Sequence, residues 1–235
     1  MVKIGDKYPA HTTNLYREET YMFTSARGSV ISRGLITWAV VAVIVASETV
    51  WSQPGTGGKG DYYPLLIGTR WDFRIVVGDQ VRGSISEVVA DVETINNVPL
   101  IRIEAQVKGA VVATEHVRVS PQGLYRHRAQ GSEAKPPILF LRYPAKAGDS
   151  WEFASQIGTE KISGKVKTRF EEVEVPAGKF KALATVIDFE VAGKPLETTI
   201  WFAEGVGKIK QTIGSGDSQV ILELERFVLG RPRKP

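Results

Sequence analysis

The sequence contains no cysteine, only three histidines and a formal net charge of only +4. The absence of cysteine excludes a disulfide scaffold, an iron–sulfur cluster, a cysteine-containing zinc site, a thiol nucleophile and a lipid anchor on an N-terminal cysteine. The small net charge gives no support for nucleic-acid binding. A hydrophobic fraction of 43% over 235 residues is instead typical of a globular protein with one large domain or two small ones.

One uncharged, apolar run stands near the N-terminus, at residues 34–47, and two arginines precede it. A membrane-spanning helix needs about 20 apolar residues, whereas the core of a signal peptide needs about 7–15. The run therefore predicts a signal peptide over residues 22–52, cleaved before Gln53, with an uncleaved N-terminal anchor as the alternative. We interpret residues 1–21 as a mis-assigned extension. The expected location is extracytoplasmic, in the periplasm or secreted, with at most peripheral membrane contact after cleavage.

From Thr69 onward, hydrophobic residues recur at every second position, and turn residues separate the runs. This period is typical of strands with one buried face, and no stretch shows a helical stripe over three turns. The pattern predicts an all-β fold, a large curved antiparallel meander sheet in a single domain over residues 62–228. Residues 53–61 are expected to be a flexible leader, and residues 229–235 a basic tail.

The motif Y-P-x-x-x-G-x-x-W-[DE]-F occurs twice, beginning at Tyr63 and at Tyr143. In each copy the proline favours an extended approach, the glycine permits a positive φ, and the tryptophan enters the sheet interior. The agreement indicates an internal duplication, with half-repeats of about 62–142 and 143–228, or convergent use of one device for starting a strand.

Three motifs together resemble a known group of proteins. They are Y-P-L-x-x-G-x-x-W at residues 63–71, V-P-A-G-x-F at residues 175–180, and W-[YF]-x-x-G-V-G-x-[IV]-K at residues 201–210. The set resembles uncharacterised exported bacterial proteins, which are distantly similar to the lipoprotein-carrier β-clamp. The resemblance implies a half-open barrel and supplies no catalytic residues. This chain departs from the carrier pattern, because no helix is expected to plug the half-barrel. Read without the resemblance, the V-P-A-G-x-F motif predicts a tight hairpin.

An open concave sheet face would be lined by large apolar side chains and could bind an apolar ligand. The residues predicted for this face are Trp71, Phe73, Trp151, Phe153, Ile187, Phe189 and Trp201. The alternative interpretation is that the tryptophans only anchor the core.

The sequence offers few residues or motifs that could support catalysis. There is no G-x-S-x-G motif for a serine nucleophile, and neither His116 nor His127 has a second ligand at metal-binding spacing. Glu171, Glu172 and Glu174 cluster beside a predicted hairpin and are expected to face water. A G-x-G-x-x-G stretch falls in the leader, outside any strand–helix context. We therefore expect no catalytic site, no metal and no cofactor.

Lys165, Lys167 and Arg169 form a basic row on one face of a predicted strand. The row is either a solvated surface or a contact for anionic lipid headgroups or envelope polymers. The sequence thus predicts an exported cell-envelope protein that is a non-enzymatic binding or structural module. The alternatives are a carrier of a lipid or acyl chain and, third, a hydrolase. Lipid or another envelope component is the expected partner, nucleic acid is not, and the oligomeric state stays open.

Overall fold

The computed structural model describes residues 61–191, 193–214 and 219–231, and these residues form twelve strands and no helix. The strands are β1 (Arg70–Val77), β2 (Gln80–Ile95), β3 (Val98–Val107), β4 (Ala110–Ser120), β5 (Gly123–Ala129), β6 (Ser132–Arg142), β7 (Ser150–Ile157), β8 (Glu160–Val175), β9 (Gly178–Val191), β10 (Lys194–Ala203), β11 (Gly207–Ile213) and β12 (Val220–Val228). Among the described residues, no helix is long and apolar enough to cross a membrane.

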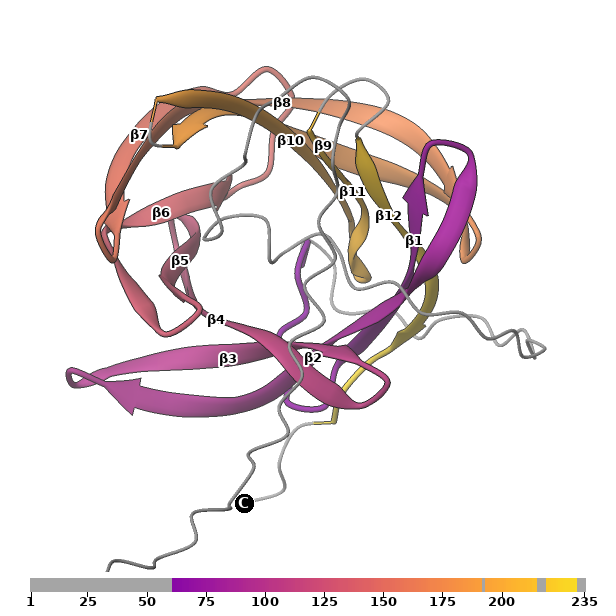
Figure 1. Cartoon of the computed structure of the whole chain (residues 1–235), viewed down its shortest axis with the longest axis horizontal. Coiled ribbons are helices and arrows are strands. Elements are labelled where there is room, and N and C mark those ends of the chain that lie inside the picture. Colours follow the sequence, from indigo (N-terminus) through magenta and orange to yellow (C-terminus); the bar gives the residue numbers. More distant parts are fainter. Residues whose placement is uncertain (1–60, 192, 215–218, 232–235) are drawn as a thin grey trace, which may run out of the picture. The chain divides into compact units, whose positions relative to one another are not determined.

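Each strand pairs with the next one in the chain, and β1 also pairs with β12, so the sheet closes into a barrel (Figure 1). The predicted all-β class, with one large antiparallel meander, is confirmed. Closure goes one step beyond the expected half-barrel, because all of β1 lies alongside β12. Both end strands of the meander therefore lose their free edges.

The alternation in the sequence is an alternation of burial in the structure. In β1, Trp71 and Phe73 are 0% exposed and Ile75 is 4% exposed, whereas the residues between them are half-buried. Burying such a side chain stabilises the fold by about 1.5–3 kcal/mol. These side chains form the barrel core together with inward-facing residues from the other strands.

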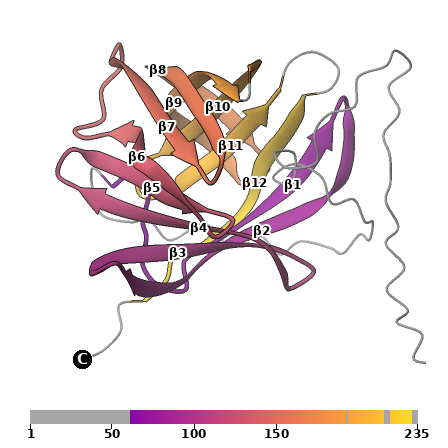
Figure 2. The same cartoon turned by 60° about the vertical axis from the view of Figure 1, so that its left-hand side comes forward.

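The two copies of the Y-P motif lead into hairpins of matching size. β1 and β2 have 8 and 16 residues, and β7 and β8 also have 8 and 16. The two hairpins lie on different sides of the barrel (Figures 1 and 2). Gly68 and Gly148 have φ angles of 86° and 83°, and each N–H donates over 2.8 Å to a carbonyl of its hairpin's long strand. These matches fit an internal duplication and the convergent use of one device for starting a strand equally well, so the duplication stays a prediction.

Each motif tryptophan also closes a hydrogen bond to another part of the barrel. The Trp71 indole N–H donates to the Val206 carbonyl over 2.7 Å, and the Trp151 indole N–H donates to the Leu139 carbonyl over 2.9 Å. A buried indole N–H requires such an acceptor. Both tryptophans therefore act as architectural anchors in this structure.

The V-P-A-G-x-F motif is the tight turn between β8 and β9, as the sequence predicts. Gly178 has a φ of 135°, which favours glycine, and Val175 pairs with it across the turn. The Ala177 N–H donates to the Leu224 carbonyl of β12 over 2.9 Å. The turn thus also attaches the hairpin tip to a distant strand.

The seam between β6 and β7 has little backbone pairing, with only two residue pairs at one end. Side chains bridge the rest. The Ser155 hydroxyl donates to the Pro136 carbonyl over 2.7 Å, and the Trp151 indole reaches Leu139 as described above. Two consecutive prolines in β6, Pro136 and Pro137, have no N–H to offer at this edge.

The predicted extension (1–21), the signal peptide (22–52) and nearly all of the leader lie outside the described residues. The export signal therefore stays a prediction.

Candidate functional site

The structure places six of the seven residues of the predicted apolar face on the inner face of the sheet. Trp151 aligns with Ile187 through β8, and Phe153 aligns with Phe189 through Gly164. Cross-strand partners share a face, so these side chains point to the same side.

Trp201 is the exception, and its predicted place on this face is corrected. It pairs with Ala184, which alternates with the inward-facing residues of β9, so Trp201 lies on the opposite face. The Trp201 indole N–H donates to Glu171 Oε2 over 2.8 Å, and the Lys210 ammonium lies 5.8 Å from the indole ring centroid. Its neighbour Phe202, 1% exposed, takes the inner position.

One end of the inner face is filled by the chain itself. Tyr63, on the segment that precedes β1, is 4% exposed and stacks on Trp71 at 5.1 Å between ring centroids. It also meets the edge of Phe202 at 5.6 Å. In Figure 1 this segment, coloured indigo, lies within the ring of strands. Trp71 and Phe73 are therefore covered, and they are not accessible to a ligand in this structure.

Two ion pairs lie inside the barrel near Tyr63. Lys208 donates to Glu87, and both side chains are only 9% exposed. Arg126 Nε donates to Glu115 over 2.8 Å. Burial, followed by the charges of Glu87 and Glu115, raises the pKa of the Tyr63 phenol well above its ordinary value. This cluster could not be predicted from the sequence, because its members come from separate strands and share no motif.

The second copy of the motif meets the first here. Burial raises the pKa of Tyr143 to about 12, and the nearby Asp61 carboxylate adds to the effect. Burial also raises the pKa of Asp61, against the lowering effect of the hydrogen bond from the Tyr63 N–H. The two Tyr-Pro segments thus supply interacting groups to one interior region.

At the other end of the inner face, the apolar side chains are less covered by other parts of the chain. Phe153 and Phe189 are half-buried, and Leu196, which pairs with Phe189, is 38% exposed. Gly164 lies between the two phenylalanines, and a Cβ atom there would lie 2.7 Å from the Phe189 Cβ. The site therefore requires glycine.

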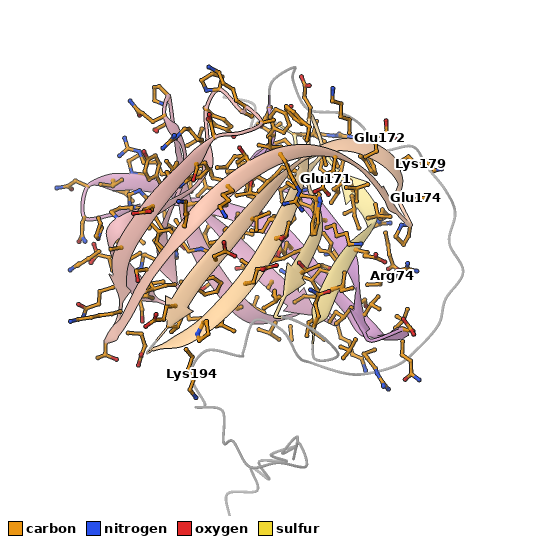
Figure 3. The ribbon with its side chains drawn as sticks, turned by 90° about the horizontal axis from the view of Figure 1, so that it is seen from above. Arg74, Glu171, Glu172, Glu174, Lys179 and Lys194 are labelled. Carbon is orange, nitrogen blue, oxygen red and sulfur yellow. The ribbon has the colours of Figure 1, made fainter. Side chains whose placement is uncertain are left out.

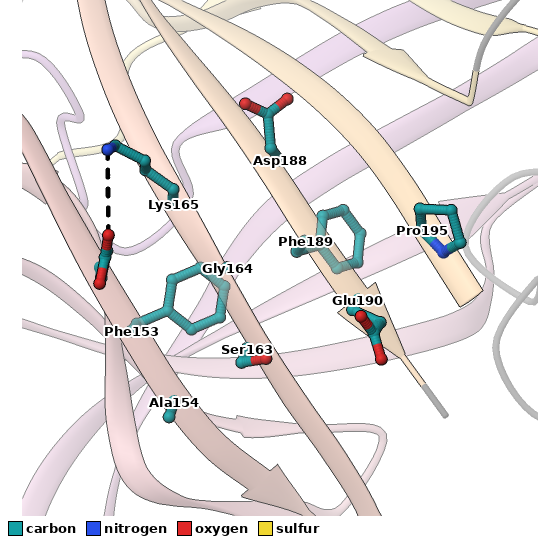
Figure 4. Close-up of a pocket in the computed structure, with 10 residues that line it drawn as sticks. Phe153, Ala154, Ser163, Gly164, Lys165, Asp188, Phe189, Glu190 and Pro195 are labelled. Atoms are coloured by element: carbon teal, nitrogen blue, oxygen red, sulfur yellow. Dashed lines mark ion pairs between the residues drawn. The ribbon is translucent and has the colours of Figure 1, made fainter. Parts of the chain in front are cut away.

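A groove of about 670 Å³ crosses β7, β8 and β9 (Figure 4). Most of the residues that line it alternate along their strands with the residues that face inward, so the groove lies on the outer face of the sheet. The lining residues are Glu152, Phe153, Ala154, Ser163, Gly164, Lys165, Asp188, Phe189, Glu190 and Pro195.

Two further grooves adjoin it on the same strands. One, of about 630 Å³, shares Ala154, Ser163 and Glu190 with the first. The other, of about 410 Å³, shares Lys165 and is lined as well by Gly148, Asp149, Ser150, Lys167, Thr168 and Arg169. The predicted basic row therefore lines a groove.

Each member of the basic row has an acidic neighbour. Lys165 Nζ lies 3.9 Å from a Glu152 oxygen, and Lys167 Nζ lies 3.9 Å from an Asp188 oxygen. These distances exceed a hydrogen bond, so the pairs are loose. Arg169, in contrast, donates to Glu171. The row is therefore not an unopposed positive surface.

Glu171, Glu172 and Glu174 lie near the tip of the β8–β9 hairpin (Figure 3). Glu172 and Glu174 are exposed, as expected, whereas Glu171 is half-buried and accepts from Trp201 and Arg169.

The histidines show different environments. His116 is 6% exposed, and its Nε2 lies 2.8 Å from Glu93 Oε2, a partner that sequence spacing does not reveal. Burial, followed by the charge of Arg118, lowers the pKa of His127. Over the described part of the chain, no three His, Asp or Glu side chains gather as a metal site would require.

No family model matches the chain, and no curated protein matches it. The chain is similar to two solved structures. One is described as a "putative lipoprotein" from Parabacteroides distasonis, with 12% identity, a TM-score of 0.45, and coverage of 72% of this chain and 99% of that chain. The other is described as a "putative exported protein with YmcC-like fold" from Bacteroides fragilis, with 12% identity, a TM-score of 0.40, and coverage of 70% and 97%. That the three sequence motifs mark a protein family therefore stays a prediction.

Proposed function

We propose that the protein is an exported, non-enzymatic module of the cell envelope that binds through the outer face of β7–β9. The observation that carries this proposal is the contrast between the two faces. The interior around Trp71 is filled by Tyr63 and paired charges, whereas three adjoining grooves open on the outside. The signal-peptide pattern of residues 22–52 supports the extracytoplasmic location.

The acidic residues of the large groove support binding better than hydrolysis. A glycosidase needs one carboxyl group whose pKa is raised by burial, beside a second carboxylate. The Glu152 side chain is 78% exposed and the Asp188 side chain is 51% exposed, with Lys165 on the strand between them. Solvated carboxylates next to an ammonium suit polar recognition, so we rank a hydrolase below a binding module.

The test is co-sedimentation of the purified chain with isolated bacterial cell envelopes. Ser163→Trp fills the groove, and we expect it to weaken envelope binding at least about tenfold, which is 1.4 kcal/mol. Thr94→Trp, at an exposed position of β2 outside the grooves, is the control and should bind as the wild type does. Equal binding by all three proteins would refute the outer-face function. Cell fractionation with N-terminal sequencing tests export separately.

A second function, carriage of an apolar ligand, is favoured by the half-buried pair Phe153 and Phe189 and by the exposed Leu196 beside them. If this end of the inner face binds an acyl chain, Phe189→Asp should abolish binding of an apolar fluorescent dye. Trp201→Ala, on the opposite face, should leave dye binding unchanged. Native mass spectrometry that shows only free protein, together with no dye binding, would exclude the carrier.

A further inference from the structure

Two neighbouring grooves on the outer face carry opposite charge. The groove shown in Figure 4 contains three carboxylates, Glu152, Asp188 and Glu190, and one ammonium, Lys165. The adjoining groove contains three cations, Lys165, Lys167 and Arg169, and one carboxylate, Asp149. The two grooves meet at Lys165, so an acidic and a basic subsite lie side by side.

The register of the strands explains this arrangement. Lys165 of β8 pairs with Glu152 of β7 on one side and with Asp188 of β9 on the other. A basic strand face is therefore flanked by acidic residues, one strand away in each direction. Adjacent strands are about 4.8 Å apart, so positive and negative groups alternate across the sheet at about that spacing.

The charged groups of the two lysine pairs can accept new partners. Lys165 and Lys167 lie 3.9 Å from their carboxylates, beyond hydrogen-bonding distance, and their side chains are 49% and 60% exposed. Exposed ion pairs of this kind contribute little to stability, so their rearrangement costs little. Ser150, paired with Lys167, places a hydroxyl donor in the basic groove.

We propose that these two grooves bind the headgroups of a zwitterionic phospholipid membrane. The phosphate is held by Lys165, Lys167 and Ser150, and the ammonium is held by Asp188 and Glu190. In such a headgroup a two-carbon link separates phosphate and ammonium, which is comparable to one strand spacing. The grooves lie on an open sheet face, so they receive a headgroup while the acyl chains stay in the bilayer.

This binding mode differs from simple attraction to anionic lipid. A polybasic surface prefers anionic vesicles because each cation adds to the attraction toward the negative lipid surface. Here the carboxylates beside the lysines oppose a purely anionic surface and favour a partner that carries both signs. The expected preference is therefore zwitterionic over anionic vesicles.

The test measures co-sedimentation of the full chain with phosphatidylethanolamine–phosphatidylcholine vesicles and with phosphatidylglycerol vesicles. We expect Lys167→Glu to weaken binding to the zwitterionic vesicles at least about tenfold, because one attraction becomes a repulsion. We expect Asp188→Lys to weaken that binding and to strengthen binding to phosphatidylglycerol. The control is Lys179→Glu, the same charge change at an exposed residue near the hairpin tip (Figure 3), and it should have no effect.

A wild type that binds neither vesicle, or that prefers phosphatidylglycerol, would overturn the proposal, as would equal effects of Lys167→Glu and Lys179→Glu. Binding of soluble phosphocholine without vesicle binding would overturn the membrane surface as the partner. The inference rests on the proposed outer-face function. A wild type that sediments with cell envelopes but not with vesicles overturns the headgroup proposal alone, whereas a wild type that sediments with neither overturns both proposals.

Discussion

Tyr63 and Tyr143 occupy equivalent places in the repeated motif, and the structure predicts that they contribute unequally to stability. Tyr63 is 4% exposed and contacts two aromatic rings, whereas Tyr143 is half-buried. Truncation of a buried aromatic side chain to alanine costs about 3–5 kcal/mol. We expect about 4 kcal/mol for Tyr63→Ala and about 1–2 kcal/mol for Tyr143→Ala, in proportion to the burial lost.

Urea unfolding followed by tryptophan fluorescence measures this difference, because Tyr63 stacks directly on Trp71. With a denaturant slope of about 2 kcal/mol/M, the midpoint should fall by about 2 M for Tyr63→Ala and by about 0.5–1 M for Tyr143→Ala. Tyr63→Phe keeps the ring stacking, so it should fold and lose less than about 1 kcal/mol even if Tyr63→Ala does not fold.

Equal losses for the two alanine variants would refute the reasoning, since they would show that the motif, and not the burial, determines the contribution. A loss below about 1 kcal/mol for Tyr63→Ala would show that this side chain does not fill the interior as the structure describes.

Two further predictions concern the interior charges and tyrosines. Lys208→Ala leaves Glu87 buried without its ion-pair partner and should lower the free energy of unfolding by about 3–5 kcal/mol, whereas Lys208→Met with Glu87→Leu should fall within about 2 kcal/mol of the wild type. Thermal melts by circular dichroism check this, and equal losses for the single and double variants would contradict it. Because the pKa of Tyr143 is raised to about 12, stability should be full below pH 10 and should fall as the pH rises from about 10 to 12. The expected loss in the free energy of unfolding is about 2 kcal/mol, a value discounted because the Tyr143 side chain is only half-buried. Urea unfolding at about pH 9–11.5 measures this loss, and the free energy of unfolding of Tyr143→Phe should fall less steeply with pH than that of the wild type.

Most of the strand pattern could be predicted from the sequence because period-two alternation is local. The Trp–x–Phe entries of β1 and β7, and the tight turn before Gly178, follow from neighbouring residues alone. Barrel closure could not be predicted in the same way, because β1 and β12 are far apart in the chain and their pairing depends on the curvature of the whole sheet.

The inner position of Lys208 has a specific physical cause. Lys208 and Lys210 are two residues apart, so strict alternation places them on one face. A register shift between Trp201 and Phe202 breaks that alternation: Lys208 pairs with Phe202 and is buried, whereas Lys210 pairs with Trp201. A bulge of this kind leaves no clear sequence signal, so the buried ion pair could not be predicted. The outward position of Trp201 has another cause, which is the regular alternation along β10: Phe202 pairs with Leu183 on the inner face, and Trp201 therefore lies on the other face.

The grooves were only partly foreseen. The basic row could be identified from alternation along one strand. Its acidic neighbours Glu152 and Asp188 could not, because they belong to separate strands whose register is set by folding. The positive side chains of this surface are therefore recognisable in the sequence, whereas the negative side chains beside them are not.

The seam between β6 and β7 divides the barrel at the boundary between its two halves. Other neighbouring strands share longer backbone ladders, whereas this seam has two residue pairs at one end and the side-chain hydrogen bonds of Ser155 and Trp151 along the rest. A seam with so few backbone hydrogen bonds has a low free energy of local opening, so we expect opening to begin there while β8 and β9 stay paired. The amide hydrogens of β7 that face β6 should therefore exchange earlier than those shared by β8 and β9.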